Sequence, residues 1–140
     1  MEKEVGFVFD DLSVYDDLNM RVLSKFLEDV YTKWDESHFF SLLDQFEVDP
    51  KKKVKKFSRG MRMKAGIASA LAHRPKLLLL DEPTSGLDTK SRKQILKLLK
   101  QTNEQERTTI IFSSHILSDM EQIATSVWFM DQGEVLLHGS

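Results

Sequence analysis

The most informative segment of the sequence is a leucine run followed by acidic and turn-forming residues, Leu77-Leu78-Leu79-Leu80-Asp81-Glu82-Pro83-Thr84-Ser85-Gly86-Leu87-Asp88. Leucines between a proline and two carboxylates predict a strand buried on both faces, as in a parallel sheet with helices on each side. Adjacent carboxylates are costly to bury unless they are paired or coordinate a cation, and Mg²⁺ prefers oxygen ligands. Asp81 and Glu82 are therefore candidate metal-site residues, although an isolated Asp-Glu-Pro more often only ends a strand and begins a turn.

Predicted strands and helices alternate around this segment. A strand is expected at residues 5–9, and the later part of the chain should contain a helix at 61–73, the leucine strand, a helix at 89–102, a strand at 108–112, a helix at 116–124 and a strand at 127–130. This order implies right-handed crossovers and an α/β fold. Asp131-Gln132-Gly133-Glu134 predicts a hairpin that pairs the last strand with residues 135–137.

Two amphipathic helices are expected before this α/β part. Apolar residues recur at helical spacing over residues 16–31 and again over residues 37–46. Val48-Asp49-Pro50 closes the pair, because proline disfavours helix in the residue before it. We therefore expect a helical subdomain at about residues 11–56 and an α/β part at about residues 57–140.

Composition excludes several classes of protein. The 20 Lys and Arg against 22 Asp and Glu give a formal net charge of −2, so there is no general electrostatic reason to bind nucleic acid. The absence of cysteine excludes disulfides, thiolate metal sites and thiol catalysis. No window approaches the ~20 apolar residues of a membrane-spanning helix, and no signal peptide is recognised.

Four motifs stand in the order typical of nucleotide-binding subunits of ATP-binding cassette (ABC) transporters, and the chain resembles that family over essentially its whole length. They are Phe57-Ser58-Arg59-Gly60-Met61 at the signature loop, Leu77 to Glu82 at Walker B, Ser85-Gly86-Leu87-Asp88 at the D-loop, and His115 at the switch histidine. Each motif alone is weak evidence, whereas the ordered combination is specific. The resemblance implies part of a P-loop NTPase-type parallel sheet with flanking helices, together with an α-helical subdomain.

The resemblance also implies roles for these residues. Asp81 would contact the Mg²⁺ shell, Glu82 would polarise the water that attacks the γ-phosphate of ATP, and His115 would contact that phosphate. Residues 57–61 would meet the ATP held by the opposite subunit, because unpaired N–H groups at a helix start attract phosphate. The simpler interpretation of Ser58 is an N-cap. Asp88 is interpreted both as an N-cap and as an acid of the dimer interface.

The sequence departs from the family pattern at two places. Asp10 stands at the Q-loop position, where the family usually has glutamine, and Arg59 and Met61 replace a glycine and a glutamine of the signature loop. The signature variant resembles a subgroup associated with export of drugs, antimicrobial peptides or lipids. In the family, the helical subdomain docks on the membrane permease.

The sequence contains no P-loop motif, G-x-x-x-x-G-K followed by Ser or Thr, which cradles phosphates with its backbone N–H groups. By resemblance, the Walker A loop and the adenine-stacking aromatic would precede Met1. The chain is therefore expected to be the C-terminal portion of a nucleotide-binding domain, and by itself neither to bind ATP tightly nor to hydrolyse it. Uncovered sheet edges are expected to cause dimerisation, swapping or poor solubility.

The leading hypothesis is the ATP-binding subunit of an ABC transporter, with ATP and Mg²⁺ as cofactors in the complete domain. The expected partners are a transmembrane permease and a second nucleotide-binding subunit, and the expected location is the cytoplasmic face of the membrane. Two alternatives remain open. One is a non-catalytic module that modulates a complete partner subunit, and the other is a soluble ABC ATPase that acts on ribosomes or DNA.

Overall fold

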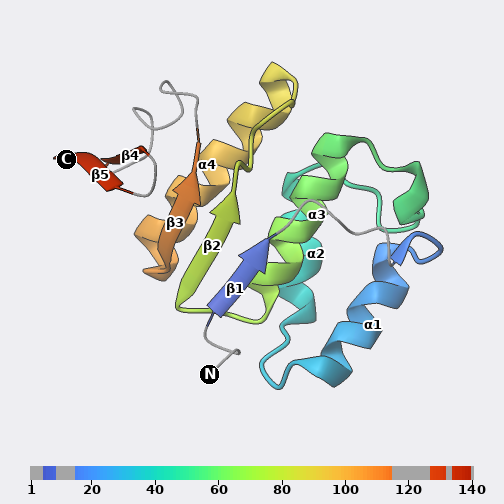
Figure 1. Cartoon of the computed structure of the whole chain (residues 1–140). Coiled ribbons are helices and arrows are strands. Elements are labelled where there is room, and N and C mark those ends of the chain that lie inside the picture. Colours follow the sequence, from blue (N-terminus) through green and yellow to red (C-terminus); the bar gives the residue numbers. More distant parts are fainter. Residues whose placement is uncertain (1–4, 9–14, 115–126, 132–133, 140) are drawn as a thin grey trace.

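A computed structural model describes residues 5–8, 15–114, 127–131 and 134–139. In chain order the elements are β1 (Val5–Val8), α1 (Met20–Val30), α2 (Glu36–Gln45), the 3₁₀ helix η3 (Val54–Lys56), α3 (Arg59–Ala72), β2 (Leu77–Asp81), α4 (Thr89–Glu106), β3 (Thr109–Ser113), β4 (Val127–Asp131) and β5 (Glu134–Gly139) (Figure 1). None of the helices in these ranges is long and apolar enough to cross a membrane.

The leucine strand β2 lies at the centre of a three-stranded parallel sheet in the order β1-β2-β3. Leu77 is in register with Val5 on one side and with Thr109 on the other. Strands β4 and β5 form a separate antiparallel hairpin. The predicted α/β architecture with a parallel sheet and a terminal hairpin is confirmed, whereas the helix predicted at 116–124 lies outside the described residues.

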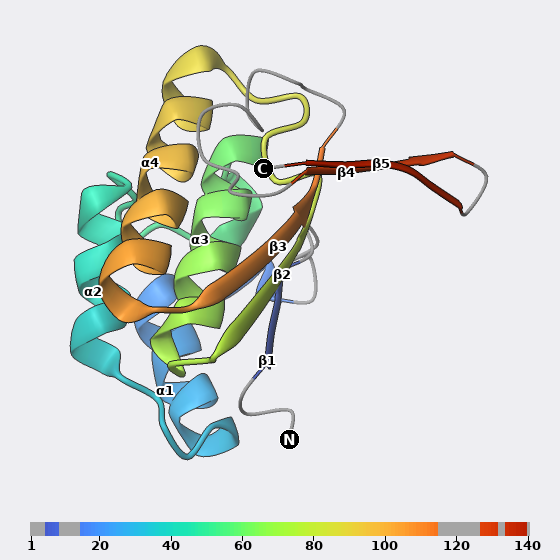
Figure 2. The same cartoon turned by 90° about the vertical axis from the view of Figure 1, so that its left-hand side faces the viewer.

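The two faces of the sheet are covered unequally, so the expectation of a strand buried on both faces was wrong. Leu78 and Leu80 are buried beneath the helices, while Leu77 and Leu79 on the other face are only half-buried. On the neighbouring strand, Ile111 is 57% exposed. Figure 2 shows that, within the described ranges, the helices all lie on one side of the sheet. The run of leucines could not reveal this, because both faces of β2 carry the same side chain.

Capping residues explain why two helices differ from their predicted bounds. Helix α1 begins at Met20 and not at residue 16, because the Asn19 side chain caps it by accepting a hydrogen bond from the Val22 amide at 3.0 Å. Helix α4 runs past the predicted end at residue 102 to Glu106, and the following Arg107 has a left-handed φ of 57°. Helix α2 begins after Asp35, whose carboxylate accepts from the His38 amide.

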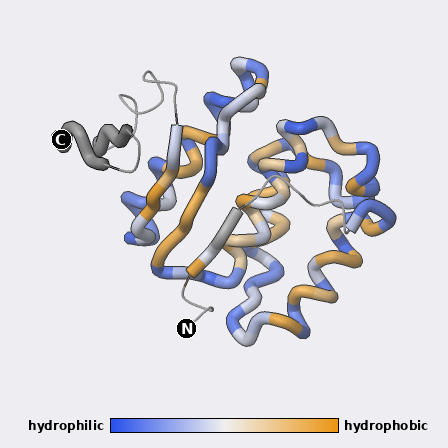
Figure 3. The backbone as a smooth tube through the Cα atoms, in the orientation of Figure 1, coloured by the Kyte–Doolittle hydropathy of each residue, from blue (hydrophilic) through white to orange (hydrophobic). Residues whose placement is uncertain are grey.

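One hydrophobic core joins the helical segment to the sheet. Phe39 of α2, Ile67 of α3 and Leu78 of β2 are fully buried in it. Gly6 allows β1 to approach α3 closely, because a Cβ atom there would lie 3.4 Å from the Ala70 Cβ and 3.1 Å from a Leu78 methyl group. Figure 3 shows that β2 is hydrophobic along most of its length and that the chain becomes hydrophilic at its carboxyl end, where Asp81 is the last residue of the strand and Glu82 follows.

Candidate functional site

Asp81 and Glu82 lie at the carboxyl end of the central strand, which is where ligands bind in open α/β sheets. Asp81 is the last residue of β2 and is exposed, and Glu82 is half-buried at the start of the following turn. The Ser85 amide closes this turn by donating to the Glu82 carbonyl at 3.2 Å. Glu82 has a left-handed φ of 49°, which is uncommon for a residue with a side chain.

Ser113, the last residue of β3, contacts both acidic residues. Its hydroxyl donates to the Asp81 carboxylate at 2.8 Å and accepts from the Glu82 amide at 2.9 Å. The sequence places Ser113 directly after a predicted strand, at an end where ligands can bind, but no motif gave it a role in the site. A signal was available, because parallel strands of similar length place their carboxyl ends side by side, and Ser113 is the register partner of Asp81.

The signature-like residues form the start of α3. Ser58 is the N-cap of that helix, and its hydroxyl accepts from the Met61 amide at 3.2 Å. Phe57 anchors this end of the helix because its side chain is buried. The first turn carries no acidic residue, so its N–H groups and the positive end of the helix dipole suit an anion.

The D-loop residues contact this helix start directly. Gly60 lies against Ser91 of α4, since a Cβ atom at Gly60 would stand 2.9 Å from the Ser91 hydroxyl oxygen. Gly86 has a left-handed φ of 74°, and its Cβ position would lie 3.4 Å from the Arg59 Nε. The structure therefore packs residues of the signature loop against residues of the D-loop.

Asp88 caps the helix that follows the D-loop. Its carboxylate accepts from the Ser91 amide at 3.2 Å. Hydrogen bonds from the Ser91 hydroxyl and amide lower the pKa of Asp88 below its ordinary value, so the capping carboxylate is held in its charged form. This geometry confirms the predicted N-cap and leaves the dimer-interface role as a prediction.

The acidic residues at the end of β2 and the packed signature-like and D-loop residues thus lie at one end of the molecule. Figure 1 shows the starts of α3 and α4 at the same end as the carboxyl ends of β2 and β3. Asp10 and His115 lie outside the described residues, so the predicted Q-loop and switch positions are not placed. Among the described residues, no group of three or more His, Asp or Glu side chains could hold a metal ion.

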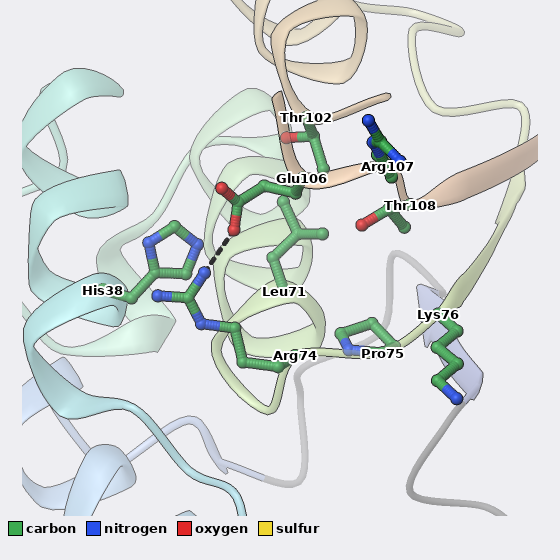
Figure 4. A pocket seen from close by; sticks show the side chains of 9 residues that line it. All are labelled: His38, Leu71, Arg74, Pro75, Lys76, Thr102, Glu106, Arg107 and Thr108. Carbon is green, nitrogen blue, oxygen red and sulfur yellow. Dashed lines mark hydrogen bonds and ion pairs between the residues drawn. The ribbon is translucent and has the colours of Figure 1, made fainter. Parts of the chain in front are cut away.

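A pocket of about 160 Å³ lies at the opposite end of the sheet, where β2 and β3 begin. Figure 4 shows the ion pair between Arg74 and Glu106 across it. Arg74 also pairs with Asp35 at 2.8 Å, and this contact lowers the pKa of Asp35. Burial lowers the pKa of His38, and the nearby Arg74 charge adds to this effect. These contacts join three elements: the start of α2, the loop between α3 and β2, and the end of α4. We therefore interpret the region as structural.

Comparisons with known proteins agree with this arrangement. A family model described as "AAA domain, putative AbiEii toxin, Type IV TA system" matches residues 3–118. The chain belongs to this family of AAA-type domains, and its relatives identify it more narrowly as an ABC nucleotide-binding subunit.

Two relatives and one solved structure illustrate the likeness. The lantibiotic transport ATP-binding protein SrtF of Streptococcus pyogenes is 37% identical over 132 residues, which cover 93% of this chain and 54% of SrtF. The bacitracin transport ATP-binding protein BcrA of Bacillus licheniformis is 46% identical over 88 residues, or 63% of this chain and 29% of BcrA. A dimeric post-hydrolysis structure of the ATP-binding cassette MJ0796 with ADP and Pi has a TM-score of 0.81 at 25% identity, covering 97% of this chain and 62% of that one.

Proposed function

We propose that this chain contributes catalytic and interface residues to the ATPase of an ABC exporter, together with a membrane permease and a second nucleotide-binding subunit at the cytoplasmic face of the membrane. The observation that carries the proposal is the acidic dipeptide at the carboxyl end of β2, at the same end of the molecule as the capped start of α3. The names of SrtF and BcrA, which refer to lantibiotic and bacitracin transport, support an exported antimicrobial peptide as the substrate class.

Asp81 has the chemistry of a Mg²⁺ ligand. It is an exposed carboxylate, and the Ser113 hydroxyl orients its Oδ1 atom. Proteins commonly hold Mg²⁺ through one or two carboxylates together with substrate phosphates, so a single protein carboxylate is sufficient here. When bound, the ion would neutralise charge on the phosphates of ATP.

The remaining roles are those that the family resemblance implies. Glu82 directly follows Asp81 and would orient and deprotonate the attacking water as a general base. The N–H groups at the start of α3 would bind phosphates of ATP held by the partner subunit. His115 would contact the γ-phosphate, and Asp10 would occupy the Q-loop position.

The helical segment supplies a candidate surface for the permease. Val22, Phe26 and Val30 recur every fourth residue on α1, and their exposed fractions are 48%, 50% and 53%. Residues at this spacing share one face of a helix, and a contiguous exposed apolar surface commonly marks an interface. We therefore assign approximately residues 11–56 to a helical subdomain that docks on the permease. Approximately residues 57–140 form the α/β part.

We further propose that these 140 residues do not hydrolyse ATP by themselves, because the sequence contains no G-x-x-x-x-G-K motif to hold the phosphates. The test measures Mg²⁺-dependent ATP hydrolysis by the isolated chain and by the transporter complex purified with this subunit. Glu82→Gln should lower turnover of the complex by about 10²-fold or more, because it removes a general base. Calorimetry should detect no tight ATP binding to the isolated chain.

Glu104→Gln is the matched control, because Glu104 is an exposed residue of α4 remote from β2 in sequence. It should leave turnover of the complex unchanged. Equal turnover by the Glu82→Gln complex would exclude the proposed base. Turnover by the isolated chain would contradict its proposed inactivity, and failure of a permease to co-purify would favour a soluble ATPase or a modulating module.

A further inference from the structure

Ser113 connects the carboxyl ends of β2 and β3 through a set of directed hydrogen bonds. The Glu82 amide donates both to the Ser113 hydroxyl at 2.9 Å and to the Ser113 carbonyl at 3.2 Å. The hydroxyl in turn donates to the Asp81 Oδ1 at 2.8 Å. One serine therefore contacts the carboxylate of the first acidic residue and the backbone of the second.

The direction of these bonds follows from the chemistry of the groups. An amide N–H can only donate, so the Ser113 oxygen accepts from Glu82, and its single proton is directed to Asp81. This proton needs an acceptor lone pair at Oδ1, which an ionised carboxylate supplies. The hydrogen bond from Ser113 thereby orients Oδ1 of Asp81.

The backbone of Glu82 has an uncommon conformation, which also depends on Ser113. Its left-handed φ of 49° is unfavourable for a residue with a Cβ atom and persists only where the surroundings hold it. The two hydrogen bonds from its amide to Ser113 hold it at one side, and the bond from the Ser85 amide to its carbonyl holds it at the other. A residue of a different strand thus helps to hold the Glu82 backbone in this conformation.

We infer that Ser113 is a positioning residue, which orients the Asp81 carboxylate and holds Glu82 in the conformation that presents its side chain to the attacking water. The inference rests on the proposed ATPase function, because it gives the two acidic residues their proposed roles. Ser113 itself touches no reacting atom, so it acts only through Asp81 and Glu82.

Threonine and valine variants separate the hydroxyl from the shape of the side chain. Ser113→Thr keeps the hydroxyl, while Ser113→Val has nearly the same shape and cannot hydrogen-bond. Both are β-branched and favoured in strands, and Ser113 is exposed, so neither should disturb packing. Ser113→Ala provides a smaller variant without the hydroxyl in case the valine variant does not fold.

The first readout is amide hydrogen exchange at Glu82 in the isolated chain, which needs no nucleotide. Both variants keep the bond from the Glu82 amide to the backbone carbonyl of residue 113, so exchange should accelerate by only about 2–10-fold in Ser113→Val and remain near the parent rate in Ser113→Thr. The second readout is ATP turnover by the transporter complex. There Ser113→Val should lower kcat by about 10–100-fold, as expected for a residue that supports a metal ligand, with KM for ATP nearly unchanged.

The outcomes distinguish this inference from the proposed function. Unchanged Glu82 exchange in Ser113→Val would overturn the inference, and so would a kcat equal to that of the parent protein despite faster exchange. Equal impairment of the threonine and valine variants would also overturn it, because that pattern reports side-chain shape and not the hydroxyl. Absence of turnover in the parent complex would instead contradict the proposed function, while the exchange contrast would still test the hydrogen bonds.

Discussion

Replacing Gly60 with alanine tests the contact between the starts of α3 and α4. The new Cβ atom would lie 2.9 Å from the Ser91 hydroxyl oxygen and 3.4 Å from the Ser91 Cβ. The first distance is shorter than real Cβ contacts allow, so either the helices separate or the hydroxyl rotates. Rotation breaks the hydrogen bond that Ser91 makes to the Asp88 carboxylate. Either response should destabilise the chain.

Two opposing effects set the magnitude. Overpacking costs about 1–3 kcal/mol, whereas exchanging glycine for alanine inside a helix recovers up to about 1 kcal/mol. We therefore expect Gly60→Ala to lower the free energy of unfolding by about 1 kcal/mol, measured by urea denaturation followed by circular dichroism. In a Ser91→Ala background the 2.9 Å contact is gone, so the same substitution should be neutral or stabilising.

A double-mutant cycle over Gly60 and Ser91 gives the decisive result. The coupling between the two substitutions should be about 1 kcal/mol or more, because the side chains share one contact. An equal effect of Gly60→Ala with serine or alanine at position 91 would refute the steric argument. A stabilising effect in the parent chain would show that helix propensity outweighs the contact.

Three further predictions concern stability, each measured by urea denaturation. Phe39→Ala should cost about 3–5 kcal/mol, because this ring is fully buried, and Phe40→Ala should cost clearly less; similar costs would contradict the assigned core. Arg74→Met should cost about 1 kcal/mol by removing two partly exposed ion pairs, and an undiminished difference in high salt would rule out that cause. Burial lowers the folded-state pKa of His38 below 6.5, so the unfolded chain binds the proton first. Stability should therefore fall as the pH decreases from 6.5 toward the folded pKa, and this slope should be smaller in His38→Gln.

Local patterns in the sequence predicted most of the regular structure. The leucine run gave a strand that ends at Asp81, and the capping residues Ser58 and Asp88 both begin helices. These features depend on neighbours within one or two turns, so they can be read along the chain. Helix bounds were less accurate where a cap such as Asn19 competed with a longer apolar periodicity.

The sequence by itself determined the class of protein, because the spacing of the signature-like residues, the leucine strand and the D-loop residues is a property of the chain. Tertiary structure alone decided which face of β2 the helices cover, since four identical side chains carry no such information. It also decided that Ser113 meets Asp81 and Glu82, and that Gly60 meets Ser91. Such contacts join residues about 30 positions apart, and their geometry depends on strand register and helix packing, which no local pattern specifies.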